Sequence, residues 1–132
     1  MRKSKTKKLA KAKADRYYSE YVRRSNSDSN GLTKCVTCGK VSHWKNMHTG
    51  HFMSRRYEST RYDERNTGVQ CVSCNTFHQG RQFRFAQHID KKHGEGTAEQ
   101  LEMKSKMLCK RNQFDYEYIA KEYKDKIKSL KT

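Results

Sequence analysis

Four of the five cysteines form two closely spaced pairs, Cys35 with Cys38 and Cys71 with Cys74. Two residues separate the thiols of each pair, and a tight turn of that length can direct both sulfurs to one point. Gly39 directly follows the first pair and gives the backbone the freedom for such a turn. Because two Cys-x-x-Cys units can supply the four thiolates of a closed tetrahedral site, the spacing predicts one structural Zn(II) bound by all four cysteines.

Other uses of the cysteines fit the sequence less well. A Cys-x-x-Cys pair can be a thioredoxin-like redox centre, but no parallel-sheet pattern surrounds either pair. Disulfides are not expected, because the N-terminus lacks the apolar segment of a signal peptide and we expect a cytoplasmic protein, in the host cell if the chain is phage-encoded. The remaining thiol, Cys109, is far in sequence from any partner and is expected to be a small buried apolar residue.

Between the two cysteine pairs lie 32 residues, more than the roughly 15 to 20 of a compact four-cysteine zinc ribbon. This insert contains His48 and His51 and a polar loop that reaches Asn66, and His78 follows the second pair. Histidine and asparagine side chains at such a position can hold a metal ion or move a proton. We therefore expect the zinc to clamp a short hairpin against a helix that begins near the second pair, with these polar side chains beside it.

The same residues resemble the HNH (ββα-metal, or His-Me finger) nuclease motif. At higher specificity, one run is similar to the phage NinG/Rap family of recombination endonucleases; it comprises Cys35-x-x-Cys38-Gly39, Gly50-His51-Phe52, Ser54-Arg55, Arg61-Tyr62-Asp63, Asn66, Gln70-Cys71-x-x-Cys74-Asn75 and Gly80. The resemblance covers about residues 31–94. It implies an α+β fold with a small zinc-stapled, treble-clef-like ββα-metal core between terminal helices. It also implies endonuclease activity on branched DNA such as Holliday junctions and D-loops.

The resemblance implies roles for four residues. His51 falls where the family has its general base, and an imidazole titrating near neutrality can take a proton from water. His78 would hold a catalytic Mg(II) or Mn(II) against the scissile phosphate, and Asn66 would fix the loop or the imidazole by hydrogen bonding. The common motif has an acid or a histidine directly before the base, where this chain has Gly50, which cannot ligate. His48 is taken as the second metal ligand in its place.

The charge of the chain predicts a polyanionic partner. The 30 Lys and Arg against 14 Asp and Glu give a formal net charge of +16, which produces a positive potential over much of a small surface. DNA is favoured over a membrane, because no segment combines a broad apolar face with a basic one. Six arginines near the expected site are predicted to contact phosphates: Arg55, Arg56, Arg61, Arg65, Arg81 and Arg84.

The chain divides into three predicted segments: a basic arm and helix over 1–30, the zinc-bound core over 31–95, and a helical segment over 96–132. Residues 2–13 hold seven Lys and Arg and no acid, so self-repulsion should keep them unfolded until DNA neutralises them. From Leu9 the pattern is helical, and Tyr17, Tyr18 and Tyr21 lie on the apolar side of the predicted helix.

The segment after the second cysteine pair is predicted to be helical in three parts. The apolar spacing continues from Phe77 to Ile89 until Gly94 stops it, and Thr97 then resembles the start of a capping box. The last helix has an apolar stripe that begins at Tyr116 and ends at Leu130. Such a stripe is either core or the seam of a homodimer.

Three alternatives remain open from the sequence. The histidines can be surface residues of a non-catalytic zinc-finger DNA binder, such as a regulator or a recombination accessory factor. Charge alone does not distinguish DNA from RNA as the partner. Asp63 or Glu64 can replace His48 as the second metal ligand.

Overall fold

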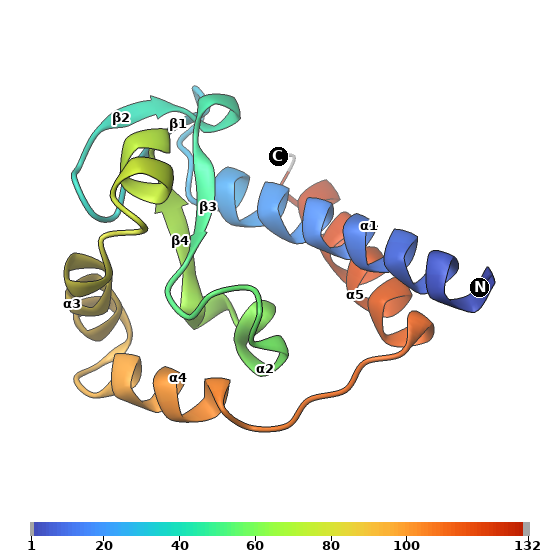
Figure 1. Cartoon of the computed structure of the whole chain (residues 1–132). Coiled ribbons are helices and arrows are strands. Elements are labelled where there is room, and N and C mark those ends of the chain that lie inside the picture. Colours follow the sequence, from blue (N-terminus) through green and yellow to red (C-terminus); the bar gives the residue numbers. More distant parts are fainter. Residues whose placement is uncertain (1, 131–132) are drawn as a thin grey trace.

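The computed structural model describes residues 2–130 and is α+β, with helices around two small sheets (Figure 1). Each sheet consists of two antiparallel strands, β1 with β2 and β3 with β4. The elements are α1 (Arg2–Ser25), β1 (Leu32–Lys34), β2 (Val41–His43), η1 (Trp44–Asn46), β3 (His48–His51), α2 (Glu58–Arg61), η2 (Glu64–Asn66), β4 (Thr67–Gln70), η3 (Ser73–Phe77), α3 (Gln82–His93), α4 (Thr97–Ser105) and α5 (Gln113–Lys128). None of the helices within residues 2–130 has the length and apolar character needed to cross a bilayer.

The two terminal helices, α1 and α5, lie side by side and run in the same direction (Figure 1). Ala14 of α1 packs near Tyr116 of α5, and further along Tyr18 packs edge-on against Tyr123, with ring centroids 4.8 Å apart. Small residues on α1 leave room for the rings of α5, so the helices approach closely. The predicted apolar side of the first helix is confirmed, and the C-terminal stripe packs within the chain, where it forms core.

The expectation of an unfolded basic arm was wrong for the residues that the structure describes, because α1 begins at Arg2. Lysine and alanine are both good helix formers, so this segment can extend the helix that the tyrosines anchor. Part of its charge is also neutralised inside the protein. Lys11 pairs with Glu58 at 3.4 Å and lies over the ring of Tyr116.

A second core joins α3 and α4 to the rest of the chain. Phe85, Ile89 and Leu101 are almost fully buried, and Phe85 packs against the ring of Phe52 beyond β3. Gly94 ends α3 with φ 116°, as the sequence predicts. The capping box at Thr97 was wrong, because Gly96 is the N-cap of α4 and the Thr97 hydroxyl donates to the carbonyl of Gly94.

The helix predicted to follow the second cysteine pair is interrupted. A π-helical turn, η3, ends at Phe77, and α3 starts only at Gln82. Between them Gln79, Gly80 and Arg81 all have positive φ, from 46° to 84°, which no helix can continue through. The break separates the turn that carries Cys71 and Cys74 from α3, the helix that packs in the second core.

The β3–β4 pair brings the polar residues of the insert beside the second cysteine pair. His48 lies opposite Gln70, Gly50 opposite Gly68 and His51 opposite Thr67. A side chain at position 50 would collide with its neighbours, since a Cβ there would lie 2.0 Å from the side-chain oxygen of Gln70. The close packing of a buried amide therefore explains why this chain has glycine directly before His51.

Candidate functional site

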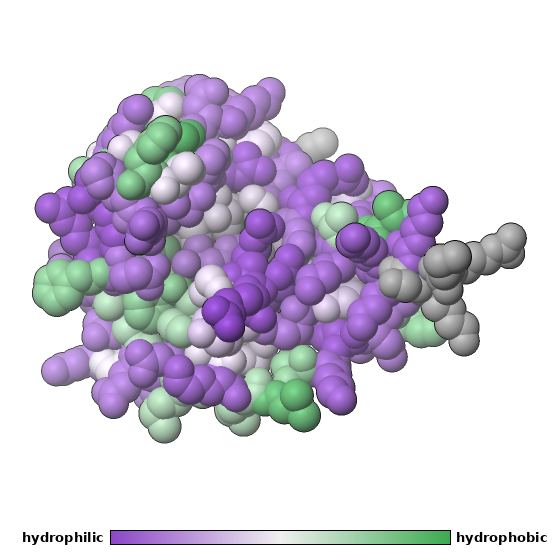
Figure 2. All heavy atoms as spheres, in the orientation of Figure 1, coloured by the Kyte–Doolittle hydropathy of each residue, from purple (hydrophilic) through white to green (hydrophobic). Residues whose placement is uncertain are grey.

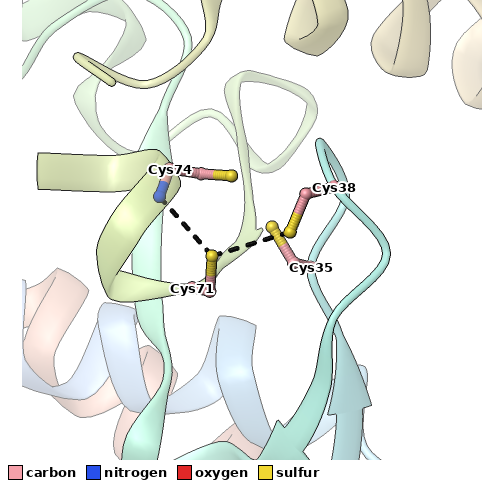
Figure 3. A group of neighbouring side chains, drawn as sticks. All are labelled: Cys35, Cys38, Cys71 and Cys74. Carbon is pink, nitrogen blue, oxygen red and sulfur yellow. Dashed lines mark hydrogen bonds between the residues drawn. The ribbon is translucent and has the colours of Figure 1, made fainter. Parts of the chain in front are cut away.

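The four cysteines predicted to bind zinc converge on one point (Figure 3). Their Sγ atoms all lie within 4.8 Å of one another, and those of Cys38 and Cys71 are 3.7 Å apart. In a tetrahedral site with Zn–S bonds of about 2.3 Å, neighbouring sulfurs are about 3.8 Å apart. The cluster therefore has the dimensions of a structural zinc site.

Two separate segments supply these sulfurs, as Figure 3 shows. Cys35 and Cys38 lie in the turn between β1 and β2, where Gly39, with φ 83°, donates its N–H to the carbonyl of Cys35. Cys71 and Cys74 follow β4 at the start of η3, and the N–H of Cys74 points at the sulfur of Cys71. The metal would tie the first hairpin to the end of the second one.

The electrostatics of the cluster favour a bound cation. Burial alone would raise the pKa of the Cys74 thiol, but hydrogen bonds from Thr37 and Arg81 outweigh it and lower that pKa. A backbone N–H from Lys40 favours the thiolate of Cys38, yet burial and the neighbouring sulfurs raise its pKa to about 12. The surroundings thus favour the thiolate of Cys74 but disfavour that of Cys38. A divalent ion bound by the cluster would keep Cys38 deprotonated as well.

A pocket of about 700 Å³ lies beside the zinc cluster. One wall is α1, another is β3 with the loop after it, and a third is the turn between η3 and α3. Among the predicted site residues, His48, His51 and Arg55 line it, and Asn75 lines it from the opposite wall. The pocket thus gathers chemically active side chains from segments far apart in the sequence.

The ring of His51 is held in one orientation. Its Nε2 lies 3.0 Å from the carbonyl oxygen of Arg61, and a carbonyl can only accept, so Nε2 donates and Nδ1 carries the lone pair. Burial lowers the pKa of His51 to about 4; the bond to Arg61 opposes this shift, while the positive charge of Arg55 adds to it. His51 is therefore a neutral imidazole at neutral pH, with Nδ1 free of any hydrogen-bond partner among the described residues.

A half-buried ion pair fixes the carbonyl that holds His51. The guanidinium of Arg61 donates to both carboxylate oxygens of Asp15 on α1, at 2.9 and 2.6 Å, and the hydroxyl of Tyr62 donates to the same carboxylate. Burial would raise the pKa of Asp15, but these two partners outweigh it and lower that pKa. Arg61 is thus engaged within the protein and has few donors left for a phosphate.

Asn66 is fully buried and organises the loop after β3. Its side-chain oxygen accepts from the N–H of Met53, and its amide group donates to the carbonyls of Met53 and Thr60. Of the two roles expected for it, these bonds are those of a residue that fixes the loop. That loop includes the segment that ends at Arg61, so Asn66 acts on His51 only through the backbone.

His48 and Asn75 face one another across the pocket. The Nδ1 of His48 lies 3.0 Å from the side-chain amide nitrogen of Asn75. His78 lies elsewhere: it is exposed at the end of η3 and is not among the residues that line the pocket. In the part of the chain that the structure describes, the four cysteines are the only group of three or more His, Cys, Asp or Glu side chains with converging ligand atoms.

The alternative ligands Asp63 and Glu64 also lie away from the pocket. Burial alone would raise the pKa of Asp63, but hydrogen bonds from Arg65 and Lys104 lower it to about 2. Glu64 accepts from the hydroxyl of Tyr123. Both carboxylates therefore connect the loop before β4 to the C-terminal helices.

The six arginines predicted to contact phosphates differ in what they contact. Arg55 lines the pocket, whereas Arg56 and Arg84 are exposed on the surface. Arg65 pairs with Asp63, and Arg81 donates to the sulfur of Cys74. Together with Arg61, these last two are engaged with other groups of the protein.

Sequence reasoning missed two residues of the pocket. Asn75 directly follows Cys74, so a helical turn that begins at the zinc cluster carries its side chain to the far side of the turn, facing β3. The signal for Asn75 was present, because it belongs to the run that resembles the NinG/Rap family. No signal marked Asp15, because its pairing with Arg61 joins segments distant in the chain.

Comparison with known proteins gives one match. A family model described as "Bacteriophage Lambda NinG protein" matches residues 1–132. Searches of curated proteins and of solved structures found no match.

Proposed function

The chain belongs to the bacteriophage lambda NinG protein family, and from this premise we propose that it is a metal-dependent endonuclease of the HNH type that acts on branched DNA. The proposed substrates are recombination intermediates such as Holliday junctions and D-loops. The reaction is hydrolysis of a phosphodiester, which needs a nucleophilic water, a cation and a fixed geometry. The pocket beside the zinc cluster is the proposed active site.

His51 is proposed as the general base. Its Nε2–H donates to the carbonyl of Arg61, so the basic nitrogen is Nδ1. The lowered pKa keeps the ring unprotonated at neutral pH, ready to take a proton from a water in the pocket. When DNA binds, the negative phosphate would raise the pKa of His51 and strengthen it as a base.

His48 and Asn75 are proposed to hold the divalent ion. Rotating the amide of Asn75 exchanges its nitrogen and oxygen, which places an oxygen 3.0 Å from Nδ1 of His48. Two adjacent ligands of an octahedral ion at about 2.1 Å are about 3.0 Å apart, so the pair fits Mg(II) or Mn(II). Such ions need few protein ligands because water and substrate phosphates complete the shell. The bound ion would stabilise negative charge on the phosphate and on the leaving oxygen.

The charge of the protein supports DNA as the substrate. The net charge of +16 attracts a polyanion, and Arg55 and Lys45 in the pocket wall provide cations where a phosphate would lie. Arg23, on α1, lines the same wall. Binding is therefore expected to weaken steeply with rising salt.

The observation on which the proposal mainly rests is the fixed imidazole of His51 in one pocket with the His48–Asn75 pair. The test is single-turnover cleavage of an end-labelled four-way junction with Mg(II), with Mn(II) and with EDTA. His51→Ala is expected to lower the rate by about 10²- to 10⁴-fold while junction binding persists. His93→Ala, at an exposed histidine of α3, is the control and should cleave like the wild type. Absence of cleavage of any junction, flap or duplex in either metal would refute the proposal.

A second candidate is a non-catalytic, zinc-stapled DNA binder. It is favoured by one observation: His78 lies outside the pocket, so the histidines of the predicted catalytic ion do not converge. In that case His51 would be a buried structural histidine. Junction binding without cleavage in any metal would support this candidate.

A further inference from the structure

Two phenylalanine rings stand in solvent, one before and one after a turn that lines the pocket. Phe77 at the end of η3 is 76% exposed, and Phe83 in the first turn of α3 is 77% exposed. Neither belongs to a hydrophobic cluster of the described chain, whereas Phe85, two residues further on, is fully buried. Figure 2 shows hydrophobic side chains standing out from the largely hydrophilic surface over α3.

The turn between these rings forms part of the pocket wall. Gln79, Gly80 and Gln82 all line the pocket and lie between Phe77 and Phe83 in the chain. A DNA strand with its phosphate in the pocket would pass along this turn, so its neighbouring nucleotides would come near the rings. The exposed cation of Arg84 adjoins Phe83 and would attract the backbone of that strand.

Hydrogen bonds hold the backbone of this turn and so fix the position from which the two phenylalanine side chains extend. The N–H of Gly80 donates to the carbonyl of Cys74 at 2.7 Å, and the buried amide of Gln70 donates to the carbonyl of Gly80 at 2.8 Å. Arg81 reaches back to the sulfur of Cys74 at 3.1 Å. The two phenylalanines are thus presented from a base attached to the zinc cluster, so little ordering remains for binding to impose.

We propose that Phe77 and Phe83 stack on bases that are unpaired at a DNA branch point, and that this contact selects branched DNA over continuous duplex. An exposed aromatic ring gains from stacking on the face of a base, and only an unpaired or partly unstacked base offers that face. Within a continuous duplex the base faces cover one another. The inference rests on the proposed function for its substrate, since it places the rings beside a cleaved phosphate.

The test measures binding without cleavage. Fluorescence anisotropy of a labelled four-way junction and of a blunt duplex of equal length is recorded on the zinc-loaded protein, without added Mg(II) or Mn(II), for the wild type, F77S, F83S and the double variant. Phe114→Ser is the matched control, because that ring is 74% exposed on α5, away from the turn between η3 and α3. A 2-aminopurine base at the branch point reports stacking directly, and circular dichroism verifies that each variant is folded.

Each single serine variant is expected to bind the junction about fivefold to a hundredfold more weakly, with duplex binding unchanged. Phe77→Trp and Phe83→Trp should retain junction binding and change the 2-aminopurine signal. F114S should resemble the wild type with both DNAs. Equal junction binding by the double variant and the wild type would overturn the inference, as would an equal loss for junction and duplex. Because no Mg(II) or Mn(II) is added, cleavage does not interfere, and these results are independent of whether the protein is a nuclease.

Discussion

Acid is expected to destabilise the folded protein through His51. Its pKa is lowered to about 4 by burial, against about 6.5 for an exposed histidine, so the unfolded chain takes up this proton more readily than the folded one. The stability that this histidine contributes is therefore complete above pH 6.5 and is lost as the pH falls toward 4. Linkage between these two pKa values lowers the free energy of unfolding by about 2 to 3 kcal/mol between pH 7.5 and pH 4.5.

The measurement is urea unfolding of the zinc-loaded protein at several pH values, compared with His51→Gln. The glutamine amide can still donate to the carbonyl of Arg61 but cannot gain a proton, so its stability curve should lack this pH-dependent part. His93→Gln, at an exposed histidine, should follow the wild type. If the wild type and His51→Gln lose stability in parallel on acidification, the ring of His51 is protonated as freely as in water, and the argument for a neutral base is refuted.

Three further results are expected. Cys74→Ser should abolish binding of one zinc per chain, measured by metal analysis, and should lower the melting temperature strongly, whereas Cys109→Ser should change neither. His48→Ala should raise the Mn(II) concentration needed for half-maximal cleavage about tenfold or more, while His78→Ala should leave it unchanged, because only the first side chain lines the pocket. Gly50→Ala should destabilise the protein by about 1 to 3 kcal/mol in urea unfolding, because the new methyl group would overlap the buried amide behind it.

Local spacing accounts for what could be predicted from the sequence. Each cysteine pair lies within one turn, so its geometry follows from neighbouring residues, and the meeting of the pairs follows from the ligand number of zinc. The buried ring of Tyr18 and the stripe that includes Tyr123 follow from helical periodicity in the same way. Gly94 ended a helix as expected, since few other residues adopt its positive φ.

What could not be predicted depends on contacts between distant segments. The left-handed turn that ends at Arg81 has no strong signal, since two of its three residues are not glycine. His78 directly precedes this turn and does not line the pocket. A continuous helix was the natural prediction there, and it left Asn75 without a role. The helical form of the basic N-terminal segment likewise depends on packing against α5, which charge and composition do not reveal.

The N-terminal helix is better regarded as part of the proposed active site than as a separate arm. Tyr18 lies beside the ring of His51, with centroids 6.3 Å apart, and donates to or accepts from the hydroxyl of Thr67 in the strand opposite it. Asp15 of the same helix neutralises Arg61, whose carbonyl orients the imidazole. Since α5 packs along α1, the C-terminal helix in turn holds Tyr18 and Asp15 in place. The zinc cluster positions one wall of the pocket, and the two terminal helices bury and orient the histidine on the other. A protein reduced to the zinc-bound segment would therefore lack the environment that keeps the imidazole of His51 neutral.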